Sequence, residues 1–297
     1  MRFYIVHAFA EEVFGGNPAG VVLTEDPLSP EQMQKIAAEL RYSETVFVRL
    51  LEDKSVHLRY FTPTAEVSLC GHGTIAAFLV LLEESRIPKD SDYLARTGSG
   101  DLLVKSQGRF IMMETAAPRQ LATIKDKETL DHLYGLMGIA YQDVILMESC
   151  QSYTRLLPLV ISTGLPDILL PVPSREILAA INPDYSALAK FSAEHKVTGV
   201  HAFTLDRESR EITAHCRNFA PLYGIDEEAA TGTANSALTQ YLYQYGLLWP
   251  EQESTFLQGE AMGRPSKIHT YLRLVDEKPQ IQVGGSAVIF AKGRITL

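Results

Sequence analysis

The fold is decided by the stretch Arg59-Tyr-Phe-Thr-Pro-Thr-Ala-Glu-Val-Ser-Leu-Cys-Gly-His-Gly-Thr-Ile-Ala-Ala77. It predicts a strand, a loop and a helix that begins at glycines. The chain repeats this design later, as Arg217-Asn-Phe-Ala-Pro221, a loop that ends in Glu227-Glu-Ala-Ala230, and Thr231-Gly-Thr-Ala-Asn-Ser-Ala237. Both copies share Arg-x-Phe-x-Pro followed by a glycine-opened helix, so we predict that the chain consists of two duplicated halves.

Each of these helix starts is suited to bind an anion. A helix leaves its first backbone N–H groups unpaired, and the positive end of its dipole lies at the same place. Two such helix starts facing each other across a cleft would hold a small carboxylate. The alternative is that Gly71, Gly73 and Gly232 only allow close packing at the beginning of each helix.

The composition is that of an ordinary globular protein, with 46% hydrophobic and 21% charged residues in a chain of 297 residues. This length allows two domains of about 150 residues, and the repeat favours two. The formal net charge is −9, and no run of Lys or Arg stands out. A protein that binds nucleic acid needs a basic surface, so nucleic acid is not expected as a partner.

The beginning of the chain, Met1-Arg-Phe-Tyr-Ile-Val-His-Ala-Phe-Ala10, has an apolar run too short for a signal peptide, and no later stretch approaches the length of a membrane span. We therefore expect a cytoplasmic protein without a membrane partner. The three cysteines, Cys70, Cys150 and Cys216, form no CxxC or Cys/His cluster in the sequence. They predict neither a disulfide framework nor a metal site, and no nucleotide-binding loop indicates a cofactor.

In the first half, one helix has a clear beginning, because Ser29 can cap it, Pro30 suits its first position and Gln32 completes a capping box. It should end near Arg41. Glu44 then lies in a loop before a strand that carries Val46, Val48 and Leu50 on one face. Further strands are predicted at 3–9, 21–23, 56–61, 101–106 and 109–114, a turn-rich loop at 14–20, and a helix from Gly73.

In the second half we predict strands at 153–162, 198–205, 211–219, 268–274, 279–283 and 286–297, and helices near 175–181, 184–195 and 233–245. Pro and Gly make 115–125 the best linker. The connections are mostly too short for the crossover helices of a doubly wound parallel sheet. We predict an α+β fold with two pseudo-symmetric halves, each a curved, barrel-like mixed sheet around a central helix. The halves would be 1–118 and 119–285, with strand 286–297 able to return to the first half and the active site in the cleft between them.

Several ordered motifs make the chain resemble the phenazine-biosynthesis PhzF-like isomerases from residue 1 to about 295. They are Gly16-Asn-Pro-Ala-Gly-Val-Val22, Ser43-Glu-Thr45, Phe61-Thr-Pro63, Cys70-Gly-His72, Arg217-Asn-Phe-Ala-Pro221, Ala230-Thr-Gly232, Met262-Gly-Arg-Pro-Ser266 and Val283-Gly-Gly285. The resemblance implies the diaminopimelate-epimerase fold, a homodimer, and an isomerase of biosynthetic metabolism that works without a cofactor.

The resemblance also implies roles for single residues. Glu44 would be the general acid/base, and burial on domain closure would raise its pKa. His72 would bind substrate or relay a proton. Asn17 would hydrogen-bond the substrate or support a residue that does, although a turn residue is an equal alternative. The substrate carboxylate would be surrounded by Gly71, Gly73, Gly232 and Thr233.

One motif departs from the usual family form, Glu-Asp-Pro-Ala-Thr-Gly-Ser-Ala. This chain reads Glu227-Glu-Ala-Ala-Thr-Gly-Thr-Ala234, with Glu228 in place of an aspartate that contacts the substrate's amino group in the phenazine enzyme, and Thr233 in place of a serine. One extra methylene moves the carboxylate by roughly an ångström, and binding geometry tolerates little such movement. The departure argues against the phenazine substrate itself.

Three functions remain open at this point. The first is an isomerase that shifts a proton and a double bond on a small cyclic or amino-bearing carboxylic acid. The second is an epimerase that uses Cys70, which stands where such enzymes carry their first thiol. The matching residue of the second half is Thr231, whose hydroxyl is too weak an acid and base for a two-thiol mechanism. The third is a small-molecule binding protein that kept the cleft and lost the chemistry.

Overall fold

The computed structural model describes residues 1–141, 156–206, 209 and 211–297, so residues 153–155 of one predicted strand lie outside the described part. The chain divides into two compact units. Unit 1 contains Met1–Glu114, Arg264–Lys267 and Gln282–Leu297. Unit 2 contains Thr115–Gly263 and Ile268–Ile281.

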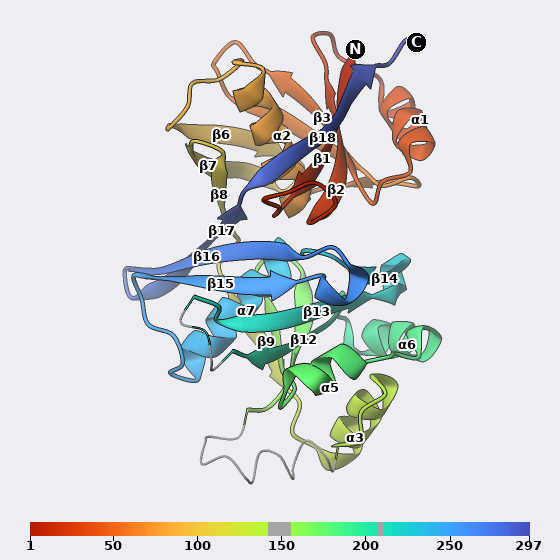
Figure 1. Cartoon of the computed structure of the whole chain (residues 1–297), viewed down its shortest axis with the longest axis vertical. Coiled ribbons are helices and arrows are strands. Elements are labelled where there is room, and N and C mark those ends of the chain that lie inside the picture. The colour runs from red at the N-terminus through yellow and green to blue at the C-terminus, as the bar shows by residue number, and fades with distance from the viewer. Residues whose placement is uncertain (142–155, 207–208, 210) are drawn as a thin grey trace. The chain divides into compact units, whose positions relative to one another are not determined.

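Unit 1 is a mixed sheet with two helices (Figure 1). The chain order is β1 Arg2–Ala8, β2 Asn17–Leu23, α1 Pro30–Leu40, β3 Thr45–Leu50, β4 Val56–Phe61, β5 Glu66–Val67, α2 Gly71–Glu83, β6 Asp92–Thr97, β7 Gly100–Gln107, β8 Phe110–Glu114, the end of β17 Lys278–Gly285, and β18 Ala287–Arg294. β1 lies antiparallel between β18 and β2, and β2 runs parallel to β3. β3 and β4 are antiparallel, β4 runs parallel to β6, and β6, β7 and β8 form an antiparallel series.

The core of unit 1 is built around α2. Its sequence GHGTIAAFLVLLE carries no charge before Glu83 except what His72 can bear, and every residue from His72 to Leu82 is buried. The helix contacts β1, β2, β3, β8 and β18, so strands cover it on several sides. A helix that is hydrophobic all round belongs in the interior, which agrees with the predicted central helix.

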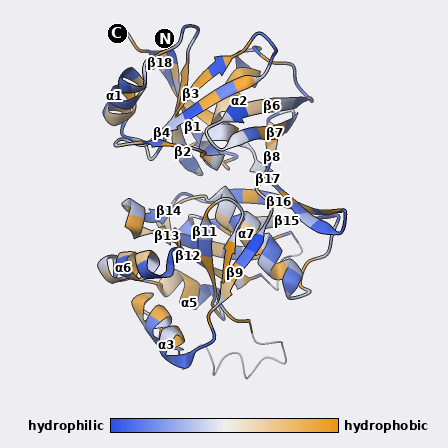
Figure 2. Ribbon diagram, turned by 180° about the vertical axis from the view of Figure 1, so that it is seen from behind, coloured by the Kyte–Doolittle hydropathy of each residue, from blue (hydrophilic) through white to orange (hydrophobic). Residues whose placement is uncertain are grey.

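α1 is an amphipathic helix on the sheet. The predicted capping box is present, since the Ser29 hydroxyl accepts the Gln32 N–H while the Gln32 side chain accepts the Ser29 N–H. Its buried residues are Met33, Ile36 and Ala37, and Figure 2 shows hydrophilic and hydrophobic residues side by side along it. The helix ends at Arg41, whose left-handed backbone (φ 58°) stops it.

Unit 2 repeats the plan with more helices (Figure 1). Its elements are β9 Arg119–Thr123, α3 Lys127–Leu136, β10 Leu159–Ser162, β11 Pro166–Pro171, α5 Arg175–Ala180, α6 Tyr185–His195, β12 Gly199–Leu205, β13 Ala214–Ala220, η1 Pro221–Tyr223, β14 Ile225–Glu228, α7 Gly232–Gln244, β15 Gln252–Gln258, η2 Glu260–Met262, β16 Ser266–Val275 from Ile268 onward, and the start of β17. β11 runs parallel to β12, β12 antiparallel to β13, and β13 parallel to β15. The same order of parallel and antiparallel pairs occurs in β2, β3, β4 and β6 of unit 1.

α7 is the central helix of unit 2. Its residues from Ala234 to Leu242 are buried, and it contacts β10 and β11. Its buried surface carries more polar residues than that of α2, and some of them pair: the Thr239 hydroxyl lies 2.7 Å from that of Thr270. The predicted α+β fold with a central helix in each half is therefore confirmed.

Several local predictions were wrong. The loop predicted at 14–20 ends early, because Asn17–Gly20 belongs to β2 and pairs with β1. Leu50 is 41% exposed rather than on a buried face, since β3 ends there. Part of the predicted linker forms β9, which pairs with β10. The strands β6, β11, β14 and β15 and the helix α3 were not predicted. β6 and β15 carry exposed polar residues, β14 has four residues, and β11 is a buried, mostly apolar run between two prolines.

Among the residues described, no helix is both long enough and apolar enough to cross a membrane.

Candidate active site

Glu44 immediately precedes β3, and a backbone hydrogen bond fixes its position. Its carbonyl accepts the N–H of Gly20, 3.1 Å away, where β2 pairs with β3. The side chain is 13% exposed, and its Oε2 lies 3.1 Å from Nε2 of His72. The structure thus brings the two predicted catalytic residues into contact within unit 1.

His72 and Cys70 come from the beginning of α2. Cys70 is the N-cap, and its Sγ accepts the N–H of Gly73 at 3.3 Å. The same sulfur lies 3.5 Å from Nδ1 and 3.7 Å from Nε2 of His72. The expectation that no cysteine takes part in a Cys/His cluster is therefore wrong for Cys70. The Cys-x-His spacing hides this contact, because it places one residue at the cap and the other inside the first turn.

Asn17 supports the imidazole from the other side. It is the first residue of β2, is buried, and places Nδ2 3.3 Å from Nδ1 of His72. An amide can offer either its N–H or its oxygen, so Asn17 can hold the ring both when Nδ1 is bare and when it carries a proton. The residue is a strand residue that contacts His72, not the turn residue we considered as an alternative.

The charges of this group favour an ion pair. Burial disfavours the charged form of both partners, but the positive charge of His72 and the polar contacts of His72 and Ser43 outweigh it and lower the pKa of Glu44. Burial also opposes a charge on His72, yet the neighbouring Cys70 and Glu44 raise the pKa of His72 well above its usual value. We expected burial on domain closure to raise the pKa of Glu44, whereas its contacts within unit 1 lower it. Together these shifts favour an anionic Glu44 beside a cationic His72.

The two glycines of α2 differ in what they allow. A Cβ on Gly73 would lie 3.0 Å from the Cys70 sulfur and 3.4 Å from Tyr60 Cδ1, so this glycine is needed for packing beneath the cap. A Cβ on Gly71 would meet only the Met113 methyl group at 3.5 Å. The N–H of Gly71 has no acceptor among the described residues. Of the two, Gly71 fits the predicted contact with a substrate anion better.

In unit 2, the corresponding helix start is arranged differently. The Thr231 hydroxyl donates to the Glu228 carboxylate at 2.7 Å and does not cap α7. The first turn of α7, at Gly232 and Thr233, therefore has no side-chain cap. The backbone carbonyl of Thr233 accepts the hydroxyl of Thr163 at 2.8 Å, which fixes this turn against the end of β10.

Gln258 organises this helix start and was not predicted. Its Nε2 donates to the Glu228 carbonyl at 2.7 Å, and its Oε1 accepts the Thr231 N–H at 3.2 Å and the Asn235 amide at 2.8 Å. It is fully buried at the end of β15. A lone glutamine in an unpredicted strand gives no sequence signal. The predicted contacts of Glu228, Gly232 and Thr233 with substrate stay predictions.

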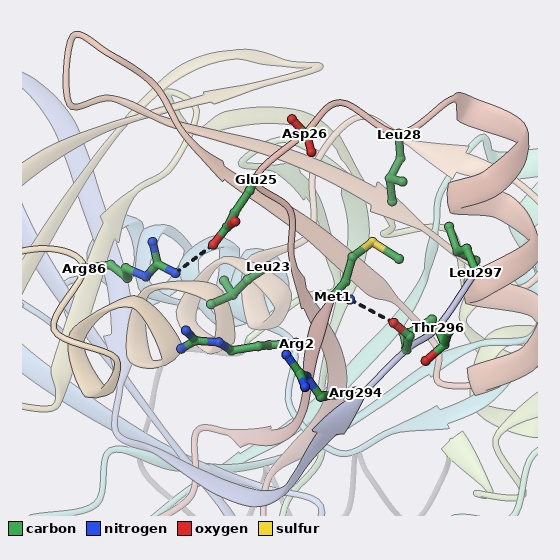
Figure 3. Close-up of a pocket in the computed structure, with 11 residues that line it drawn as sticks. Met1, Arg2, Leu23, Glu25, Asp26, Leu28, Arg86, Arg294, Thr296 and Leu297 are labelled. Atoms are coloured by element: carbon green, nitrogen blue, oxygen red, sulfur yellow. Dashed lines mark hydrogen bonds and ion pairs between the residues drawn. The ribbon is translucent and has the colours of Figure 1, made fainter.

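A pocket of about 610 Å³ lies elsewhere in unit 1, beside the two chain ends (Figure 3). Arg86 pairs with Glu25 at its rim, and the Met1 amino group donates to the carbonyl of Ile295. None of its lining residues is a predicted site residue. We assign it no chemistry.

The family model of the phenazine biosynthesis-like proteins (PhzC-PhzF) matches residues 6–293. The chain belongs to this family. An uncharacterized isomerase of Clostridium acetobutylicum is 33% identical over 100% of this chain and 98% of its own length. The trans-2,3-dihydro-3-hydroxyanthranilate isomerase of Pseudomonas aeruginosa is 30% identical over 100% of this chain and 99% of its own.

The phenazine biosynthesis-like family also accounts for the fold. The crystal structure of the PhzF-family protein of Bacillus anthracis superimposes with a TM-score of 0.87 at 27% identity, covering 100% of this chain and 99% of that one. The resemblance predicted from the motifs is confirmed, and the chain is an isomerase of this family.

Proposed function

We propose that the protein moves a proton and a double bond on a small cyclic or amino-bearing carboxylic acid, with Glu44 as the single acid/base and no added cofactor. The observation that carries this proposal is the contact of the buried Glu44 carboxylate with His72, 3.1 Å from oxygen to nitrogen. A carboxylate and an imidazolium held this close supply both a base and a balancing positive charge.

The reaction needs only one carboxyl group. The Glu44 carboxylate accepts the proton from a carbon next to the double bond, and the C–H electron pair forms a new double bond to the neighbouring carbon. The old double bond's electron pair moves to its far carbon, which takes the proton back from the Glu44 carboxyl. His72 stabilises the negative charge at each end of this cycle, and the carboxyl group returns to its ionised state.

The substrate class follows from the positions that can bind it. The first N–H groups of α2 favour a carboxylate, and the relative from Pseudomonas aeruginosa is named for a cyclic amino-bearing carboxylic acid. Glu228 is proposed to contact the amino group, from a longer side chain than the family's aspartate. We therefore propose a related substrate of somewhat different shape from that of the relative.

Unit 2 offers no second carboxyl group at the position that matches Glu44. The phenylalanine of the repeated Arg-x-Phe-x-Pro motif gives the matching positions in the two units. Phe61 pairs with Thr45 of the neighbouring strand in unit 1, and Phe219 pairs with Val200 in unit 2. The proposed base precedes Thr45, so its counterpart in unit 2 is Gly199. A Cβ at Gly199 would lie 1.9 Å from the carbonyl oxygen of Phe219. This position can carry no acidic side chain, which favours chemistry from unit 1 alone.

The direct test is turnover in D2O. The enzyme is incubated with trans-2,3-dihydro-3-hydroxyanthranilate and with related unsaturated cyclic amino acids, and products are followed by NMR and mass spectrometry. We expect an isomerised product that contains solvent deuterium at the carbon that gains the proton. A ligand that binds without exchange or isomerisation would instead support the small-molecule binding protein.

Replacing Cys70 separates the isomerase from an epimerase. Cys70→Ala removes the weak cap of the Gly73 N–H but keeps a small apolar side chain at a buried position. We expect a loss of about 1 kcal/mol in the free energy of unfolding and activity within a few-fold of wild type. Kinetics and thermal unfolding of the purified variant check both. Near-total loss of turnover in a folded variant would favour the epimerase.

The pH profile should be broad. The active form needs Glu44 ionised and His72 protonated. Because the pKa of Glu44 is lowered from 4.5, the acidic limb should lie below this value. Because the pKa of His72 is raised well above 6.5, activity should be lost only as the pH rises through that higher value. A measured profile of kcat/KM whose limbs sit at ordinary Glu and His values would contradict the ion pair.

We further propose that the enzyme is cytoplasmic, and that it acts as a homodimer, as the resemblance implies. Sedimentation equilibrium of the purified chain tests the dimer. A single species at the mass of one chain, 32.9 kDa, would contradict it.

A further inference from the structure

Three different metal-binding atoms meet at the beginning of α2. The Glu44 carboxylate, the Cys70 sulfur and a His72 ring nitrogen all lie within 4.8 Å of one another. In the part of the chain that the structure describes, no other group of three such side chains comes this close. Cys70 and His72 are buried, and Glu44 is nearly so.

The spacing of these atoms suits a single small cation. With Zn–S bonds of about 2.3 Å and Zn–N or Zn–O bonds of about 2.0–2.2 Å, neighbouring ligands of a tetrahedral zinc ion stand roughly 3.3–3.7 Å apart. Here the Cys70 sulfur is 3.7 Å from Nε2 of His72, and Oε2 of Glu44 is 3.1 Å from the same nitrogen. These two separations are within a few tenths of an ångström of what one shared ion requires, and the Glu44 oxygen and the Cys70 sulfur lie within 4.8 Å of each other.

The carboxylate contact is also poorly aligned for a hydrogen bond. Glu44 Oε2 is buried and accepts no hydrogen bond of acceptable angle, although it is 3.1 Å from the His72 nitrogen. Two ligands of one metal ion have this relation, because the ion lies on the nitrogen's lone-pair axis and the oxygen lies to the side of it.

We propose that Cys70, His72 and Glu44 bind one zinc-like divalent cation, with the fourth coordination position open. Thiolate and imidazole favour zinc over magnesium or calcium. Binding would release the protons of the Cys70 thiol and of the His72 nitrogen. The contact of Asn17 with the other ring nitrogen, at 3.3 Å, would orient the ligating imidazole.

The bound cation would be a reversible inhibitor. It would occupy the oxygen with which Glu44 takes up the proton and the nitrogen with which His72 balances the charge. This consequence rests on the proposed function, whereas binding itself does not.

Metal binding is tested without any assay of turnover. Chelator-stripped protein is titrated with Co²⁺ as a spectroscopic probe, and its affinity for Zn²⁺ is measured by competition with a chromophoric chelator. We expect one ion per chain, a thiolate-to-cobalt absorption band in the near ultraviolet, and visible bands of tetrahedral intensity. Thermal unfolding confirms that each variant is folded.

Matched variants assign the ligands. Cys70→Ala should abolish the thiolate band and weaken zinc binding by about 100-fold, and Glu44→Gln should weaken it by at least about 10-fold. Cys216→Ala is the control, because Cys216 is also a free, buried cysteine but lies in β13 of unit 2. It should leave both the band and the affinity unchanged.

Two results would overturn the proposal: wild type that binds no stoichiometric metal, or zinc affinity that is the same in folded Cys70→Ala as in wild type. Each leaves the proposed isomerase intact if turnover still depends on Glu44. Conversely, metal binding could depend on Cys70 while Glu44→Gln leaves turnover unchanged. This result would support the metal site and contradict the proposed function.

Discussion

Glu44→Gln should lower kcat by about 10²-fold or more, while the chain stays folded and binds its ligand with similar affinity. The amide is nearly the same size as the carboxyl group but cannot accept and return a proton, and a lost general acid/base costs a factor of this order. Steady-state kinetics and a calorimetric titration with the same compound check the two parts of this expectation separately.

The matched control for this variant is Glu66→Gln. Glu66 belongs to the same unit, but its carboxylate is exposed and pairs with Arg59 at 2.7 Å. It should leave kcat and KM unchanged. Full activity of a folded Glu44→Gln enzyme would show that another group moves the proton.

The largest effect on stability is expected from Arg217→Leu in unit 2. The Arg217 guanidinium pairs with Glu227 through two bonds of 2.8 Å, and both side chains are about nine-tenths buried. Its NH1 group also donates to three carbonyls at the end of α5, those of Leu178, Ala179 and Ile181. Leucine would leave the buried Glu227 carboxylate without its cation and would remove the guanidinium bonds to these carbonyls, at a cost of about 3–5 kcal/mol in the free energy of unfolding.

The repeat supplies the control, because Arg59 has the same place in unit 1. It pairs with Glu66 in the same two-bond manner and lies over the ring of Phe61, but both charged side chains are more exposed. An exposed pair contributes about 0–1 kcal/mol, so Arg59→Leu should cost no more than this. Denaturant unfolding of both variants gives the comparison. Equal losses would mean that burial of Arg217 does not set its contribution.

The sequence was sufficient for the elements that carry strong local signals. The capping box at Ser29, the uncharged run of α2 and the repeated Arg-x-Phe-x-Pro motif predicted the central helices and the duplication, and the structure has them. The strands β6 and β15 escaped prediction, because exposed polar residues mask their alternation and only their neighbours define them.

The sequence was sufficient to predict which residues belong to the candidate site, but not how their charges affect one another. Glu44 and His72 were expected to be catalytic, yet their contact depends on β3 and α2 meeting in the folded unit. Without knowledge of that contact, burial alone predicts a raised pKa for Glu44, whereas the adjacent imidazolium lowers it. Gln258 and the contact of Cys70 with His72 were missed for the same reason, since both are products of tertiary packing.

In the proposed reaction, one carboxyl group both removes and returns the proton. The most direct measurement is the face on which the product is protonated, determined by NMR for the first compound that the enzyme isomerises, with substrate deuterated at the position that loses its proton. One carboxyl group must deliver the proton to the face from which it took it, and with a side chain only 13% exposed part of the deuterium should be retained in the product. Delivery to the opposite face, with all of the deuterium lost to solvent, would require a second base and would contradict the account.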